Sequence, residues 1–250
     1  MKTAVIAHRG ASGLVGHENT LEAFEAAIRI GADYVEFDVR KTADGWLVVF
    51  HDSKIEDVSI AQITYGRLCE ITARIGYTVP LLKDVLKLCQ GKIKLDIELK
   101  EVGYERAVVD MVKSRFGYDD FVMKSFSDAA ITHIKKYDKN IKTGLLVGRK
   151  HIPIKTWADE VFPMRRLTAC HADFVAPHYG LCSRAYVKYM HRHGLKVFVW
   201  TVNSPKAIRR CLWCNVDAVI TDRPDLAEKI MKGLRHSKRC AKLMSSRFTK

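Results

Sequence analysis

Residues 34–40 read YVEFDVR and residues 94–100 read KLDIELK, so charged and apolar side chains alternate along both segments. Alternation with a period of two is typical of a β-strand whose two faces meet different surroundings. The charged residues of each segment share one face: Glu36, Asp38 and Arg40 in the first, and Asp96, Glu98 and Lys100 in the second. In an antiparallel sheet such a face is exposed to solvent. In a parallel barrel, which helices cover from outside, it points into the interior.

The rest of the chain favours the barrel. We expect strands over nine ranges: Ala4–Ala7, Tyr34–Val39, Trp46–Phe50, Lys94–Leu99, Phe121–Lys124, Thr143–Val147, Asp173–Ala176, Lys196–Thr201 and Ala218–Thr221. The turn sequence TADG at residues 42–45 makes residues 46–50 a hairpin arm of the second strand. The other eight strands alternate with amphipathic helical patterns over about 225 residues, which is typical of an α/β fold of the (β/α)8 TIM barrel type. A doubly wound open sheet is the alternative, because the number of strands does not show whether a sheet closes.

Composition excludes several classes of protein. The 250 residues are 48% hydrophobic, with a mean hydropathy of −0.10, which excludes a disordered chain and a collagen. No apolar stretch approaches the roughly 18 residues of a membrane-spanning helix, and the apolar run near the N-terminus is too short for a signal peptide. The seven cysteines are scattered and odd in number, which favours reduced thiols and a cytoplasmic location.

The positive charge gathers at the C-terminus. The formal net charge is +14, and from Lys229 onward there are eight basic residues and no acid. No Pro- or Gly-rich linker interrupts the chain, so we expect one barrel over residues 1–234 and a basic tail over residues 235–250. Phe248 is the one aromatic residue of that tail, which argues against a specific nucleic-acid partner. The tail is expected either to be a solvated terminus or to make a weak contact with anionic membranes.

Inward-pointing carboxylates require compensation. Clustered acids in a barrel mouth repel one another and lose hydration unless a cation neutralises them. Oxygen ligands of this kind suit one Mg²⁺ or Ca²⁺ rather than Zn²⁺, for which His and Cys are preferred. A barrel would therefore hold a divalent cation near the charged faces of residues 34–40 and 94–100.

Two histidines follow strand-like segments. His8 closes the first strand and His51 closes the hairpin arm. Barrel active sites lie at the C-terminal ends of strands, so two imidazoles there can divide general-acid and general-base work. Arg9 and Lys100 add the guanidinium fork and the point charge that bind a phosphate.

These residues resemble the glycerophosphodiester phosphodiesterase family. The matching motifs run in order over nearly the whole chain: HRG at 8–10, ENT at 18–20, EFDV at 36–39, VFHD at 49–52, DIELK at 96–100, SF at 125–126, VWTVN at 199–203 and ITDRP at 220–224. Two departures from the family pattern are His17, where Pro is usual, and a short segment over residues 53–77, where the family has an insertion that helps to cover the substrate.

The resemblance implies a fold, a reaction and a set of residues. The family is a TIM barrel that uses a divalent cation to hydrolyse glycerophosphodiesters, which are small molecules, to glycerol 3-phosphate and an alcohol. The implied roles are metal binding by Glu36, Asp38 and Glu98, acid–base catalysis by His8 and His51, phosphate contacts by Arg9 and Lys100, and lining of the substrate cleft by Phe126 and Trp200. Either water or the glycerol 2-hydroxyl can be the nucleophile in this reaction, and either histidine can be the base.

Two alternative functions use the same barrel. The short segment over residues 53–77 and the basic tail would suit a lysophospholipase D that releases the head group of lysophospholipids at a membrane surface. A barrel without turnover that binds anionic lipid or nucleic acid is the other alternative, and the complete set of acid–base and metal-binding residues argues against it.

Overall fold

The strands close into a barrel. The computed structural model describes residues 3–148 and 159–234, so the basic tail lies outside the described residues. Eight parallel strands form the barrel: β1 (Ala4–Ala7), β2 (Tyr34–Lys41), β6 (Lys94–Leu99), β7 (Phe121–Ser125), β8 (Thr143–Val147), β9 (Phe174–Pro177), β10 (Lys196–Val199) and β11 (Ala218–Thr221). Because β1 pairs with both β11 and β2, the sheet has no open edge between its first and last strands. The predicted TIM barrel is confirmed and the doubly wound alternative is excluded.

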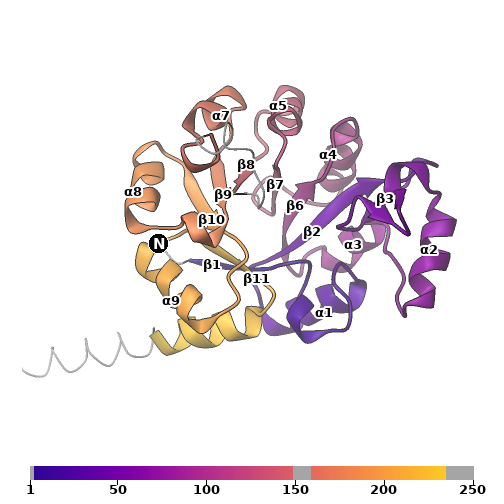
Figure 1. The fold of residues 1–250 in the computed structure, drawn as a ribbon, viewed down its shortest axis with the longest axis horizontal. Coiled ribbons are helices and arrows are strands. Elements are labelled where there is room, and N and C mark those ends of the chain that lie inside the picture. Colours follow the sequence, from indigo (N-terminus) through magenta and orange to yellow (C-terminus); the bar gives the residue numbers. More distant parts are fainter. Residues whose placement is uncertain (1–2, 149–158, 235–250) are drawn as a thin grey trace, which may run out of the picture.

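Helices surround the strands (Figure 1). They are α1 (Leu21–Ile30), α3 (Leu82–Cys89), α4 (Glu105–Lys113), α5 (Asp128–Tyr137), α7 (Met164–Ala169), α8 (Arg184–Arg192), α9 (Pro205–Cys214) and a last helix over residues 224–234. The side chains of Thr20, Ser127, Ser183 and Ser204 cap four of them by accepting a hydrogen bond from a backbone N–H of the first turn. Among the described helices, none has the length and apolar character needed to cross a bilayer.

The two faces of the barrel strands separate apolar from charged side chains. Val35, Phe37 and Val39 of β2 pack in one buried apolar cluster with α1, α3 and α4 on the outside of the barrel. Glu36 and Asp38 are equally buried, on the opposite face. This arrangement confirms that the alternating charges point into the barrel. They do so because helices already cover the other face.

The hairpin arm runs back toward the barrel. β3 (Leu47–Val49) pairs antiparallel with β2, with Val49 opposite Val39. The backbone N–H of Phe50 then donates to the carbonyl of Asp38. His51 therefore reaches the level of Asp38 because the arm returns antiparallel along β2, as expected from the predicted hairpin.

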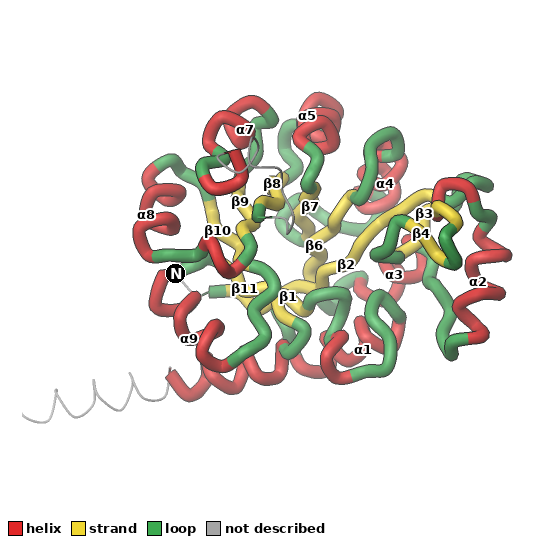
Figure 2. Tube along the Cα trace, in the orientation of Figure 1, coloured by secondary structure: helices red, strands yellow, loops and turns green. Residues whose placement is uncertain are grey.

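The segment after the arm folds into a small unit beside the barrel (Figure 2). It contains β4 (Lys54–Ile55), β5 (Val58–Ser59) and α2 (Tyr65–Arg74), an element that the sequence analysis did not predict. Its own buried cluster comprises Val48, Phe50, Ile60, Ile63, Leu68, Ile71, Val79 and Leu81. The short insertion thus packs against the arm that carries His51.

Two glycines permit close approaches. Gly10 has φ +83°, and a Cβ there would lie 2.6 Å from the backbone of Ala23 in α1, so the loop after β1 sits directly on that helix. Gly144 of β8 is paired in register with Phe174 of β9, and a Cβ on Gly144 would lie 2.0 Å from the Phe174 ring. The absence of a side chain at residue 144 leaves room for this aromatic ring inside the barrel.

Replacing Gly144 with Ala should destabilise the barrel, because the new methyl group overlaps the Phe174 ring. Overpacking a close-packed core costs about 1–3 kcal/mol of unfolding free energy. Gly66→Ala in α2 is the matched control, since a Cβ there meets nothing within 4 Å. Urea unfolding followed by circular dichroism should give a lower midpoint for Gly144→Ala alone. Equal midpoints for the two variants would contradict this packing.

Candidate active site

A cavity of about 520 Å³ opens at the C-terminal ends of the barrel strands. One side is polar and is lined by His8, Arg9, Glu36, His51, Glu98, Lys100 and Lys124. The other side is largely apolar and includes Phe126 and Trp200. The cavity therefore brings together eight of the nine predicted site residues. The ninth, Asp38, is fully buried and contacts Arg9 and Lys100.

Three carboxylates meet in this cavity. Glu36 and Asp38 come from β2 and Glu98 comes from β6, and one oxygen of each lies within 4.8 Å of the others. The register of the two strands causes this grouping, because Asp38 is paired with Glu98 and Glu36 with Asp96. Residues in register on neighbouring parallel strands point in the same direction, so the four acids form two adjacent rows.

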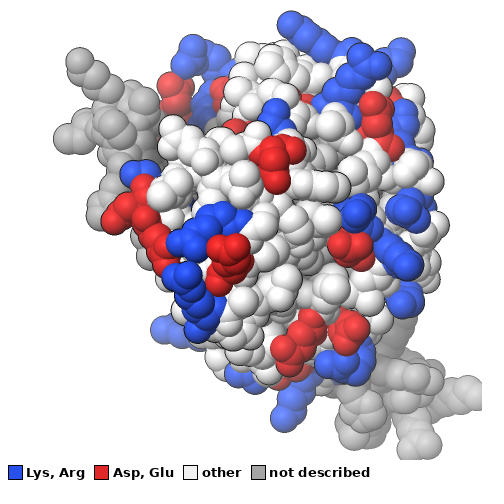
Figure 3. Space-filling view, turned by 90° about the vertical axis from the view of Figure 1, so that its right-hand side faces the viewer, with Lys and Arg blue, Asp and Glu red and all other residues white. Residues whose placement is uncertain are grey.

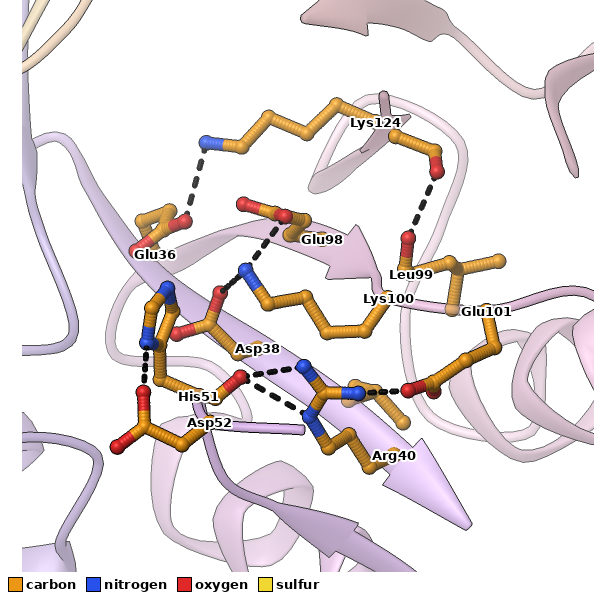
Figure 4. A network of polar contacts seen from close by, with 12 residues as sticks. Glu36, Asp38, Arg40, His51, Asp52, Glu98, Leu99, Lys100, Glu101 and Lys124 are labelled. Atoms are coloured by element: carbon orange, nitrogen blue, oxygen red, sulfur yellow. Dashed lines mark hydrogen bonds and ion pairs between the residues drawn. The ribbon is translucent and has the colours of Figure 1, made fainter. Parts of the chain in front are cut away.

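Two lysines compensate the acids (Figure 4). Lys100 Nζ lies 2.9 Å from Asp38 Oδ1 and 2.6 Å from Glu98 Oε1. Lys124, from β7, is almost completely buried and places Nζ 3.2 Å from Glu36 Oε1 and 2.7 Å from Asp96 Oδ2. Each ammonium thus bridges β2 and β6, and the repulsion between the two rows of acids is reduced.

The carboxyl groups differ in their affinity for protons. Burial alone would raise the pKa of Asp38, but Lys100 and Arg9 outweigh it and hold this pKa far below its usual range. Burial raises the pKa of Glu98 to about 7, with Lys100 opposing and Asp38 and Glu36 reinforcing the increase. Asp38 is therefore the firmly ionised member of the cluster. The positive charge around Glu98 is too small to offset the effect of its burial on its pKa.

The cluster suits a divalent cation. Asp38 Oδ1 is buried, with the Lys100 ammonium 2.9 Å away. Three carboxylates that offer oxygens to one point are the ligand set that hard cations such as Mg²⁺ and Ca²⁺ prefer. The double charge of such a cation would also stabilise the ionised form of Glu98. The residues present thus fit a bound cation.

His8 is held by a carboxylate from the other end of the chain. Its Nδ1 lies 2.6 Å from Asp222 Oδ1, and its Nε2 lies 4.0 Å from Glu36 Oε2. Asn203 and Ser12 also donate to Asp222. Burial would raise the pKa of Asp222, but the hydrogen bonds from His8, Asn203 and Ser12 outweigh burial and lower it. An ionised Asp222 accepts the Nδ1 proton of His8, which leaves Nε2 directed to the carboxylate cluster.

His51 is held through its backbone as well as its ring. Arg40 donates from Nε and from a terminal nitrogen to the His51 carbonyl, at 2.9 and 2.6 Å, and also pairs with Glu101 (Figure 4). The ring Nδ1 lies 2.8 Å from Asp52 Oδ1. Burial and the positive charge of Lys100 lower the pKa of His51. The imidazole is therefore mainly neutral near pH 7.

Arg9 links the first loop to the acids. Its backbone N–H donates to Glu36 at 2.9 Å, its Nε lies 3.3 Å from Asp38 Oδ2, and its terminal nitrogen donates to Glu18 at 2.6 Å. Asn19 completes this loop by donating from Nδ2 to Asp38 at 2.8 Å. The guanidinium remains at the cavity wall, where its fork can meet an anionic group.

Aromatic side chains form the apolar side. The Phe126 and Trp200 rings meet edge to face at 5.6 Å, and His178 packs against Trp200 at 5.3 Å. Trp200 is oriented by its Nε1–H, which donates to the carbonyl of Ala176 at 2.7 Å. Phe126 and Trp200, which resemblance assigned to the substrate cleft, thus share one wall of the cavity.

Sequence reasoning did not single out several residues of this site. Lys124, Asp222, Asn203 and His178 contribute to the cavity or its supports and were given no role. A signal for Lys124 was present, since a lysine within the apolar run FVMKS at residues 121–125 is unusual for a buried strand. Asp222 and Asn203 lay inside quoted motifs, but the contact of Asp222 with His8 depends on closure of the barrel, and Asn203 acts on His8 only through Asp222.

A sequence model of the glycerophosphoryl diester phosphodiesterase family matches residues 8–226. The chain belongs to this family. A glycerophosphodiester phosphodiesterase of Caldanaerobacter subterraneus is 30% identical over 93% of this chain and 100% of its own length. The glycerophosphodiester phosphodiesterase structure from Parabacteroides distasonis is 29% identical, with a TM-score of 0.80 over 93% of this chain and 98% of that one. An Oleispira antarctica phosphodiesterase, solved in complex with the product sn-glycerol-3-phosphate, is 25% identical, with a TM-score of 0.78 over 92% of this chain and 96% of that one.

Glu98→Gln should reduce stabilisation by divalent cations. A ligand that binds only the folded state raises its stability in proportion to the logarithm of its concentration over Kd, and loss of one carboxylate weakens binding. We expect 10 mM MgCl₂ or CaCl₂ to raise the melting temperature of the wild type by several degrees and that of Glu98→Gln by clearly less. Glu25→Gln, on the exposed face of α1, is the control. Identical cation-induced shifts in all three proteins, measured by scanning fluorimetry, would exclude this cluster as the cation site.

Proposed function

We propose that the protein hydrolyses glycerophosphodiesters to sn-glycerol 3-phosphate and an alcohol, with one divalent cation bound by Glu36, Asp38 and Glu98. The observation that carries this proposal is that two histidines, His8 and His51, line the same cavity as the three-carboxylate cluster. A relative named glycerophosphodiester phosphodiesterase matches 93% of the chain, and a related phosphodiesterase structure holds the product sn-glycerol-3-phosphate.

Cationic side chains would bind the phosphate. Arg9 and Lys100 line the cavity beside the acids. Arg9 offers a planar fork that can donate two parallel hydrogen bonds to phosphate oxygens, and Lys100 offers a point charge. When bound, the cation would supply Lewis-acid polarisation of a phosphate oxygen and fix the orientation of the diester. Mg²⁺ and Ca²⁺ both suit the all-oxygen ligand set.

The histidines would move the protons. Neutral His51 is the form that accepts a proton, so its ring would activate the nucleophile, either water or the glycerol 2-hydroxyl. His8 would act as the acid in its doubly protonated form, in which Nδ1–H donates to Asp222 and the Nε2 proton passes to the leaving alkoxide. We assign the base role to His51 because its pKa is lowered, and the acid role to His8 because a carboxylate partner holds its ring.

The alternatives receive less support. The relatives are named for glycerophosphodiesters, so a lysophospholipase D that acts on lysophospholipids is not favoured. The grouped histidines, acids and cations also argue against a barrel without turnover that binds lipid or nucleic acid. A cytoplasmic location, and a weak contact of tail residues 235–250 with anionic membranes, stay as predictions from sequence.

Chelation should stop turnover, and replacement of His51 should slow it strongly. Loss of general acid–base catalysis costs about 10²–10⁴-fold in rate, so we expect His51→Ala to lose at least 10²-fold in kcat. EDTA should stop the wild type, and added Mg²⁺ or Ca²⁺ should restore it. Release of sn-glycerol 3-phosphate from glycerophosphocholine measures both effects. His193→Ala, at the exposed end of α8, is the control. Full activity after exhaustive chelation would refute the metal assignment.

Asp222→Asn should slow the reaction without weakening substrate binding. An amide cannot fix the His8 tautomer as a carboxylate does, and loss of such supporting partners typically costs about 10–100-fold. We expect kcat to fall by this amount while KM changes little, and Asp222→Glu to recover part of the loss. Asp225→Asn, in the first turn of the helix that follows, removes the partner of Arg223 and should keep full activity. An unchanged kcat for Asp222→Asn would show that this contact does not position His8.

A further inference from the structure

One long stretch of the chain contains no acidic residue. Between Asp173 and Asp217 there is neither Asp nor Glu, although the whole chain has 28 acidic residues in 250. The same stretch carries seven Lys and Arg: Arg184, Lys188, Arg192, Lys196, Lys206, Arg209 and Arg210. It includes α8 and α9, which lie side by side on the outside of the barrel (Figure 1). The proposed hydrolysis uses none of these basic residues.

Three of these cations form a row along α8. Arg184, Lys188 and Arg192 are spaced by four residues, so they lie on one face of the helix, over about 12 Å of its length. All three are exposed. They line a shallow groove of about 870 Å³ between α8 and the C-terminal end of α9. A continuous positive strip therefore borders this groove.

An exposed tryptophan forms the opposite side of the groove. Trp213, near the end of α9, is 65% exposed, which is unusual for so large an apolar side chain. The Arg184 guanidinium lies over its indole ring, 5.2 Å from the ring centre. This cation–π contact holds the aromatic ring and the first cation of the row together at the surface.

The cations of the row have no acidic partners within the described part of the chain. No carboxylate there lies within 4.0 Å of Arg184, Lys188 or Arg192. The nearby Asp217 binds His191 at 2.7 Å and the backbone of Val197 at 2.8 Å.

The face shown in Figure 3 is different, because blue and red side chains are interleaved on it. In α2, for example, Arg67 pairs with Glu56 and Glu70. Among the described residues, the α8–α9 face therefore combines a row of unpaired cations with an exposed aromatic side chain, whereas Arg67 of α2 has acidic neighbours.

We propose that the α8–α9 face docks the protein on an anionic lipid surface. Its basic residues are distributed along the outer wall of the barrel, as suits a surface of many negative charges. Lys and Arg contribute to binding near such a surface, and Trp is favoured at the membrane–water interface. The charged side chains of the groove are exposed or half-buried, so none is held in the buried, fixed position that a dedicated small-molecule site provides.

Nucleic acid fits this face less well than lipid. Binding of single strands relies on several aromatic side chains on which successive bases stack. Trp213 is the one aromatic residue that lines the groove. The exposed Tyr189 of α8 instead packs against His193.

The docking face adjoins the mouth of the catalytic cavity. β9 ends at Pro177, Tyr179 lines the cavity, and α8 begins at Arg184. Helices of a barrel start at the end where the strands finish, so the first cation of the row lies at the catalytic end. Docking along α8 would hold the mouth near the lipid surface. The docking proposal does not depend on the proposed reaction.

Vesicle sedimentation with the 250-residue chain tests the docking. The probes are vesicles of phosphatidylcholine alone and vesicles of three parts phosphatidylcholine to one part phosphatidylglycerol. We expect binding to the anionic vesicles in 100 mM NaCl, loss of binding in 500 mM NaCl, and none to phosphatidylcholine alone. The triple variant Arg184→Glu, Lys188→Glu, Arg192→Glu should bind at least about tenfold more weakly.

The matched control carries the same change of net charge elsewhere. Lys87→Glu, Lys92→Glu and Lys136→Glu replace three exposed lysines outside the α8–α9 face and should bind within about threefold of the wild type. Equal losses in the two triple variants would overturn the proposal, because net charge or the basic tail would then explain binding. No binding by the wild type would overturn it too.

A second variant and a competing ligand complete the test. Trp213→Ala alters no charge and is expected to weaken vesicle binding severalfold. This variant tests the docking face even if the triple variant does not fold. Unfolding curves and turnover of a soluble substrate should be unchanged in Trp213→Ala. Tighter binding to a 30-nucleotide single-stranded RNA than to vesicles, lost in the Arg184, Lys188 and Arg192 variant, would assign the face to nucleic acid and overturn the lipid proposal.

Discussion

Burial of four acids inside one barrel is the constraint on which the site depends. Glu36 and Asp38 on β2 lie in register with Asp96 and Glu98 on β6, and all four face the interior. Like charges so close together and so poorly hydrated are costly unless positive charge accompanies them. Lys100, together with Lys124 and Arg9, supplies part of that charge from three other positions in the chain. A divalent cation at the cluster would supply the rest. The buried acids therefore both destabilise the barrel in the absence of a cation and form the site at which a catalytic cation would bind.

The supports of the two histidines extend this arrangement outward. Asp222 comes from the end of the last strand and orients the His8 ring. Arg40 continues the charged face of β2 beyond the acids and binds the backbone carbonyl of His51. Strand β2 therefore contributes to the cation cluster and also to the placement of the arm that carries His51. The unpredicted unit with α2 packs on that arm and stabilises it from the other side.

In the part of the chain that the structure describes, basic side chains are paired with acids inside the barrel but lack acidic partners on the α8–α9 face. In the interior each lysine is paired with carboxylates from two strands, as Lys100 and Lys124 show. On the α8–α9 face the row that begins at Arg184 has no acid beside it within the described residues. Compensated charge is fixed and can position a substrate, whereas uncompensated exposed charge attracts a large anionic partner at longer range. The two regions meet near Tyr179, at the mouth of the cavity.

The sequence by itself determined the class of fold and most of the cavity lining. Alternation along residues 34–40 and 94–100 places side chains on faces by local geometry, and the order of the motifs carried the family resemblance. It did not reveal that Lys124 bridges Glu36 and Asp96, or that Asp222 supports His8 across 214 positions of sequence. The Lys124 contacts require β2, β6 and β7 to pair in register, and the Asp222 contact requires β1 to pair with β11. Register and closure, rather than local pattern, decide which inward side chains become neighbours.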